Sequence, residues 1–109
     1  MEKRTLETLL PLIEKVTKEG KLKWSIDPSG GYLSHSGKYI INVFDRSVEA
    51  ESGYGIRLVD ANDNVIDYLS AEFPDEHYDI LHTINEDARR SALNIDEALN
   101  SIAQNLISL

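Results

Sequence analysis

The chain has 109 residues and a formal net charge of −8, from nineteen Asp and Glu against eleven Lys and Arg. It contains no cysteine, which excludes disulfides, thiolate catalysis and cysteine-based zinc or iron–sulfur sites. Its length, close to the ~100–150 residues of a typical domain, predicts a single compact domain over residues 1–109.

The charge is unevenly distributed along the chain. Residues 25–109 carry fifteen Asp and Glu against five Lys and Arg, whereas residues 1–24 carry four against six. Such an acidic surface repels nucleic-acid phosphate and anionic lipid and attracts basic groups. We therefore expect a protein partner with a basic surface, no direct binding to nucleic acid and no association with membranes. No signal peptide or membrane span is evident, so we expect a cytoplasmic protein.

Residues 5–19 predict a helix, because apolar residues recur there at helical spacing and Gly20 is a natural terminator. Either Thr5 or Thr8 can cap it. If Thr8 is the cap, Pro11 lies in the first turn, where its missing N–H matters little. If Thr5 is the cap, Pro11 lies further in and should bend the helix.

The next segment changes to the period of a strand. In residues 21–27 apolar and polar side chains alternate, which predicts a strand with one buried face and places Trp24 in the core. Residues 27–31 predict a turn, and residues 32–36 can extend or pair. Residues 38–45 are apolar on both faces and predict a central strand.

Residues 47–55 are acidic and contain glycine, and we predict a loop there. Residues 56–60 and 65–69 predict two strands joined by a polar hairpin connection. The sheet is expected to end by residue 73.

Two helices are predicted after the sheet. Pro74 suits the first turn of a helix that runs to Ala92, with acidic residues near its start. Asn94 is predicted to end this helix or to cap the next, with Glu97 at the reciprocal capping position. The predicted fold is therefore α+β: an N-terminal helix, an antiparallel meander of three to four strands, and two C-terminal helices packed on one face.

Two motifs are reminiscent of metal sites. Asp60, Asn62 and Asn64 place oxygen atoms at alternating positions, as in a calcium loop, but the pattern lacks its Gly and Glu, so we interpret it as a hairpin turn. His82 and Glu86 lie four residues apart on a predicted helix, where a solvated or ion-paired histidine is the simpler interpretation. We predict no metal, no cofactor and no catalytic residue.

Two surfaces are candidates for binding. The first combines the acidic loop, its aromatic residue and the acidic face of the first C-terminal helix. Its residues are Glu49, Glu51, Tyr54, Asp75, Glu76, Asp79, Glu86 and Asp87. The second is a heptad stripe on the last helix, which packs on the sheet or else forms a dimer seam. Its residues are Ile95, Leu99, Ile102, Leu106 and Leu109, of which the last four would make the seam of a homodimer.

The leading functional hypothesis is a small, acidic, non-enzymatic protein-interaction domain that acts as a regulator or accessory subunit. One alternative is an acidic mimic that fills the nucleic-acid channel of a nuclease or other DNA-binding protein. In architecture and charge only, the predicted protein is similar to some small phage-encoded inhibitors of nucleic-acid enzymes. A second alternative is a small-molecule-binding domain with a pocket between sheet and helices. Its raw material would be Tyr32, Tyr39, Tyr68, His77 and His82.

Overall fold

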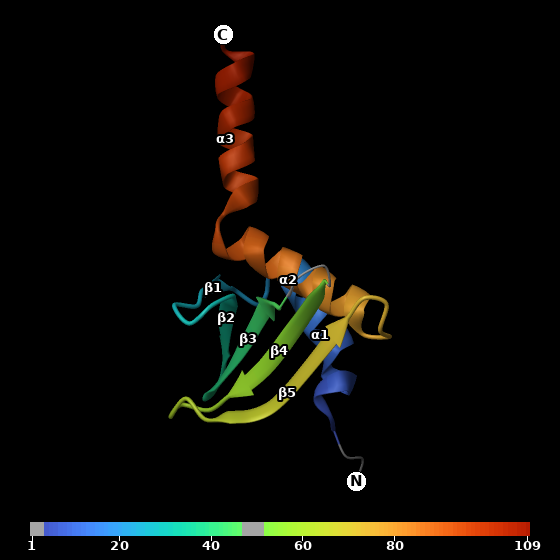
Figure 1. Ribbon diagram of the computed structural model, residues 1–109. Helices are drawn as coiled ribbons and strands as arrows, with labels where there is room; N and C mark the ends of the chain where they lie inside the picture. The colour runs from blue at the N-terminus through green and yellow to red at the C-terminus, as the bar shows by residue number, and fades with distance from the viewer. Residues whose placement is uncertain (1–3, 47–51) are drawn as a thin grey trace.

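The computed structural model describes residues 4–46 and 52–109, and Figure 1 shows their arrangement. The predicted α+β fold is confirmed: an N-terminal helix is followed by an antiparallel meander and two C-terminal helices. The sheet has five strands in the order β1-β2-β3-β4-β5, not three to four. The elements are α1 (Leu6–Lys18), β1 (Ser25–Ile26), β2 (Tyr32–Ser36), β3 (Tyr39–Asp45), β4 (Gly53–Val59), β5 (Val65–Glu72), α2 (Tyr78–Ala92) and α3 (Ile95–Ile107).

Helix α1 begins at a reciprocal capping box. The side chain of Thr5 accepts from the N–H of Thr8, and the side chain of Thr8 accepts from the N–H of Thr5. These bonds satisfy backbone donors that a helix start otherwise leaves free. Pro11 therefore lies inside the helix, beyond its first turn.

Strand β1 covers only Ser25–Ile26, not the predicted residues 21–27. The segment before it forms hydrogen bonds with side chains, not the backbone hydrogen bonds of a strand pair. The carbonyl of Lys23 accepts from Ser34 Oγ at 2.5 Å, and the N–H of Trp24 donates to Ser91 Oγ at 3.3 Å. Trp24 is buried, as its alternation with neighbouring apolar residues predicted. The loop predicted over residues 47–55 lies partly outside the described residues. Its predicted end at residue 55 is wrong, because β4 begins at Gly53.

The core lies between α2 and the helix-facing side of the sheet. Leu81, Ile84 and Ala88 of α2 are at most 1% exposed, as are Val43 of β3 and Ile56 of β4, which are register partners. Helix α1 adds Leu6, Leu10 and Ile13 to the same cluster. Both helices lie on one face of the sheet (Figure 1).

Helix α2 begins four residues later than Pro74, at Tyr78. The N–H of Asp75 donates to the carbonyl of Glu72, and the N–H of Glu72 donates to the carboxylate of Asp75 at 3.1 Å. Such local side-chain bonds offer the backbone an alternative to the helix. The predicted start at Pro74 is therefore wrong.

The prediction that both C-terminal helices pack on one face of the sheet holds for α2 only, because α3 stands apart from the layers that α1 and α2 form with the sheet. Among the described residues its element contacts are with α2 only, and no residue of α3 is buried. The radius of gyration is 15.6 Å, above the ~13 Å of a compact domain of this length, which reflects this projection. Asn94 turns the chain here with φ +52, and its side chain does not cap α3, so the predicted capping box is absent.

Gly31, which directly precedes β2, lies close to the backbone of β3. Gly31 has φ +78, and an added Cβ would lie 2.1 Å from the carbonyl oxygen of Val43. Gly37 has φ +62 with open space around it. We expect Gly37→Ala to lower the free energy of unfolding by about 1 kcal/mol through backbone strain alone. Gly31→Ala should cost about 3 kcal/mol or more, because the backbone must also move. Urea unfolding measures both, and equal losses would contradict this account of Gly31.

Candidate functional site

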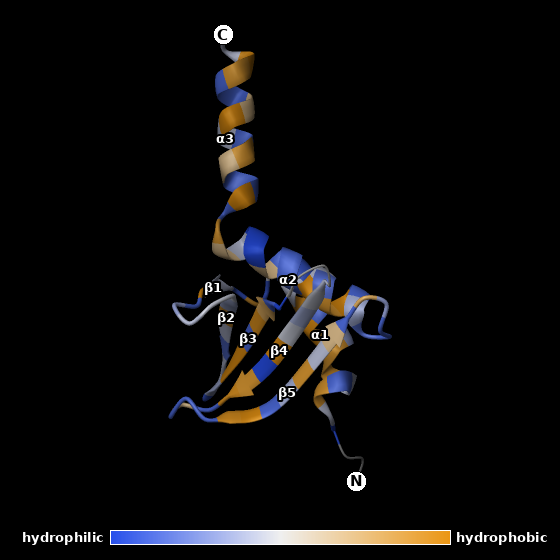
Figure 2. Ribbon diagram, in the orientation of Figure 1, coloured by the Kyte–Doolittle hydropathy of each residue, from blue (hydrophilic) through white to orange (hydrophobic). Residues whose placement is uncertain are grey.

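The apolar stripe of α3 is exposed to solvent from Leu99 to Leu109, whereas Ile95 at its start is half-buried. The exposed fractions are 53% for Leu99, 52% for Ile102, 63% for Leu106 and 100% for Leu109. Figure 2 shows these apolar bands recurring along the projecting helix. A helix of 13 residues is about 20 Å long and is only marginally stable in water by itself. The stripe, which we call the α3 seam, is thus an apolar surface that residues 4–46 and 52–109 leave largely uncovered.

The flanks of the α3 seam are almost uncharged. Asp96 and Glu97 occupy the first turn, and residues 98–109 contain no charged side chain. Arg90 at the end of α2 forms an ion pair with Asp96, which ties the base of α3 to α2. Small Ala98 and Ala103 adjoin the seam and would allow a second helix to approach closely.

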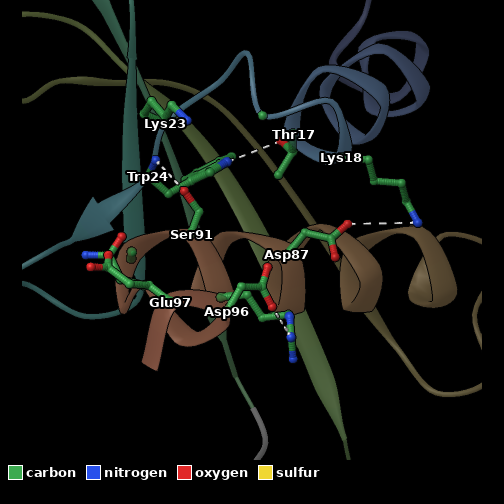
Figure 3. Close-up of a pocket in the computed structure, with 12 residues that line it drawn as sticks. Thr17, Lys18, Lys23, Trp24, Asp87, Ser91, Asp96 and Glu97 are labelled. Carbon is green, nitrogen blue, oxygen red and sulfur yellow. Dashed lines mark hydrogen bonds and ion pairs between the residues drawn. The ribbon is translucent and has the colours of Figure 1, made fainter. Parts of the chain in front are cut away.

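A hollow of about 590 Å³ lies at the junction of α1, α2 and α3 (Figure 3). Trp24 forms its inner wall, and its indole N–H donates to Thr17 Oγ1 at 3.2 Å. Lys18 Nζ lies 3.9 Å from Asp87 Oδ2 across the rim. Lys23, Asp96 and Glu97 also line the hollow, so basic and acidic groups surround it together. A hollow lined by both acidic and basic side chains is better suited to contact with the polar surface of another protein than to enclosing a small ligand.

An aromatic cluster joins the start of β4 to α2. The hydroxyl of Tyr54 and Nδ1 of His82 are 2.8 Å apart, and both rings contact Tyr78. A neutral imidazole with an unprotonated Nδ1 accepts from the hydroxyl. Burial of the ring, followed by the negative charge of Asp45, raises the pKa of Tyr54. Tyr54 is therefore not on a loop as expected, and His82 is held by Tyr54 and not simply solvated.

The predicted acidic surface is only partly assembled. Asp75, Glu76 and Asp79 are exposed around the start of α2. Further along, Glu86 lies 3.4 Å from Arg89, and Asp87 faces Lys18. Two of the five carboxylates thus have basic neighbours in their own chain. Glu49 and Glu51 lie outside the described residues, so their predicted role is unaffected.

The Asp60 segment is a hairpin turn, as interpreted from the sequence. The carboxylate of Asp60 accepts from the N–H groups of Asn62 and Asn64 and from the Asn64 amide, and these bonds lower the pKa of Asp60. Across the described residues, no group of three His, Asp or Glu side chains is placed to hold a metal ion. Nor is any described helix long and apolar enough to cross a membrane.

The side chains suggested for an internal pocket are separated. Tyr39 lines an apolar groove of about 370 Å³ between α1 and the sheet, beside Leu9, Leu12 and Leu22. His77 lies 3.6 Å from Glu7 of α1. Tyr32 packs against the core, Tyr68 stacks on Phe44, and His82 belongs to the Tyr54 cluster. No shared pocket results from these five residues.

The face of the sheet opposite Val43 carries a further arrangement, which the sequence did not reveal. Arg57 Nε donates to Asn42 Oδ1 at 3.1 Å, and its guanidinium lies 4.4 Å from the centre of the Phe44 ring. The Asn42 amide in turn donates to Asp27 Oδ2 at 2.9 Å. Arg57 borders a hollow of about 460 Å³ that apolar side chains such as Leu33 line together with Asp27 and Asp63. Strand register sets Asn42 beside Arg57, and a side-chain hydrogen bond adds Asp27 from another segment, so no local motif could have indicated the arrangement.

Comparison with protein-family models, with curated proteins and with solved structures finds no match to this chain.

The raised pKa of Tyr54 makes a testable contribution to stability. Because the folded-state pKa is raised, this contribution is fully present below the unfolded value of about 10 and is lost as the pH rises through the folded value. We expect the free energy of unfolding to fall with pH above about 10, and less steeply in Tyr54→Phe. Urea unfolding from pH 8 to 11.5 measures both slopes, with circular dichroism at pH 7 as the control for folding. Identical slopes would contradict this assignment.

Proposed function

We propose that this protein is a small, non-enzymatic protein-interaction domain that serves as a regulator or accessory subunit in the cytoplasm. The α3 seam carries the proposal. An exposed stripe of Leu and Ile on a projecting helix is unfavourable in water unless another surface covers it. Because the buried core excludes α3, the helix is available for binding without any unfolding of the body.

The acidic start of α2 provides a second contact for a partner with a basic surface. Asp75, Glu76 and Asp79 are exposed there, and they form no ion pair among the described residues. Such charges accelerate encounter more than they add affinity. We therefore assign specificity and rate to this surface and affinity to the α3 seam.

The nucleic-acid mimic receives less support from the geometry. A mimic needs rows of free carboxylates on one face, whereas Glu86 and Asp87 have basic neighbours in their own chain. The mimic also leaves the α3 seam without a role.

Two matched double variants test the proposal in a pull-down from a lysate of the encoding organism. Leu99→Glu/Leu106→Glu places charges on the seam, whereas Asn100→Glu/Gln104→Glu adds the same charge on the opposite side of α3. We expect the seam variant to capture at least about tenfold less partner, because burying two carboxylates is costly, and the control to lose about twofold or less. Capture by the native seam should resist high salt, since the contact is apolar. Equal capture by both variants would exclude the seam as the binding element.

A small-molecule site is the second candidate, because Arg57 is held by Asn42 and Phe44 beside a hollow with both apolar and polar walls. A fixed guanidinium beside apolar walls suits a carboxylate on an apolar body. Benzoate is a suitable probe, followed by backbone NMR shifts up to about 10 mM. We expect saturable shifts near Arg57 that Arg57→Gln weakens at least about tenfold and that Arg89→Gln leaves unchanged. Shifts that do not saturate would remove this candidate.

A further inference from the structure

We propose that the occupant of the α3 seam is the α3 helix of a second copy of this chain, in antiparallel orientation. The inference rests on the proposed function, since it names the partner of the same seam. Three features of α3 support it: the pairing of its apolar residues, the position of its charges and its projection from the body.

The seam is complementary to itself when the second helix runs in the opposite direction. In that register Leu99 faces Ile102 of the partner copy, and Ile95 faces Leu106. Each of the four layers then joins one leucine to one isoleucine, so all layers have equal volume. Ala98 and Ala103 beside the seam let the two helices approach closely.

The charges favour the antiparallel arrangement over the parallel one. Asp96 and Glu97 are the only charged residues of α3, and both lie in its first turn. Parallel helices would bring four carboxylates and two acidic bodies together. Antiparallel helices place them at opposite ends of a ~20 Å pair, beyond the ~8 Å screening length at physiological salt.

The C-terminal ends of the two helices also lie far apart in the antiparallel pair. The last turn of α3 contains no basic residue, so the negative end of its dipole is uncompensated within the helix. In the antiparallel pair this end reaches the junction hollow of the other copy, where Lys23 offers a basic group, while Lys18 and Arg90 are already paired with Asp87 and Asp96. A parallel pair would bring the two uncompensated ends together.

Self-association is measured by sedimentation equilibrium between about 1 and 500 μM. Two short helices bury less than the ~1,600 Å² of a standard interface, so we expect dissociation on the order of micromolar. Leu99→Glu/Leu106→Glu should be monomeric throughout, and Asn100→Glu/Gln104→Glu should associate like the native chain. A native chain that stays monomeric to 500 μM would overturn the inference. Seam-dependent capture of a different protein in the pull-down would then still uphold the proposed function.

The orientation is testable because the chain has no cysteine of its own. A mixture of Ile95→Cys and Leu106→Cys copies should form a mixed disulfide, since the antiparallel register places these positions opposite each other. Leu106→Cys alone should not cross-link, because two such residues would lie about 16 Å apart along the axis, beyond the ~7 Å limit between Cα atoms. Cross-linking of Leu106→Cys alone would show a parallel pair and refute the antiparallel arrangement.

Discussion

The packing of α2 on the sheet determines the rest of this structure. Leu81, Ile84 and Ala88 fill the space above Val43 and Ile56, and all five side chains are almost completely buried. Once this layer is formed, α1 adds its own apolar face beside α2, and the core is complete. Among the described residues, α3 contacts α2 and does not contribute to this core.

The backbone turn at Asn94 directs α3 away from α2 and the sheet. With φ +52 the backbone leaves the direction of α2, and the pair of Arg90 with Asp96 holds the base of α3. The hydrophobic effect that buries the α2 stripe acts equally on the α3 seam, but none of the described residues covers Leu99, Ile102 or Leu106. The proposed protein partner would supply the missing cover.

The polar network of the open sheet face and the aromatic cluster illustrate a different principle. Arg57, Asn42 and Asp27 come from three separate segments, and Tyr54 and His82 are 28 residues apart. Each group gains its neighbour only through strand register or helix docking. Their hydrogen bonds fix side chains that would otherwise be mobile, which stabilises the arrangement of the elements that carry them.

Residue spacing alone determined the α+β class, the helical stripes, the hairpin at Asp60 and the burial of Trp24, because each follows from local periodicity or turn chemistry. It also identified the heptad spacing of α3. The strand count, the late start of α2 and the pairing of Tyr54 with His82 depended on tertiary contacts, as did the extension of β4 to Gly53. Whether the α3 stripe faces the sheet or solvent was likewise decided only in three dimensions. Apolar periodicity shows that a surface needs a partner, whereas the space left by the other elements decides whether that partner belongs to the same chain.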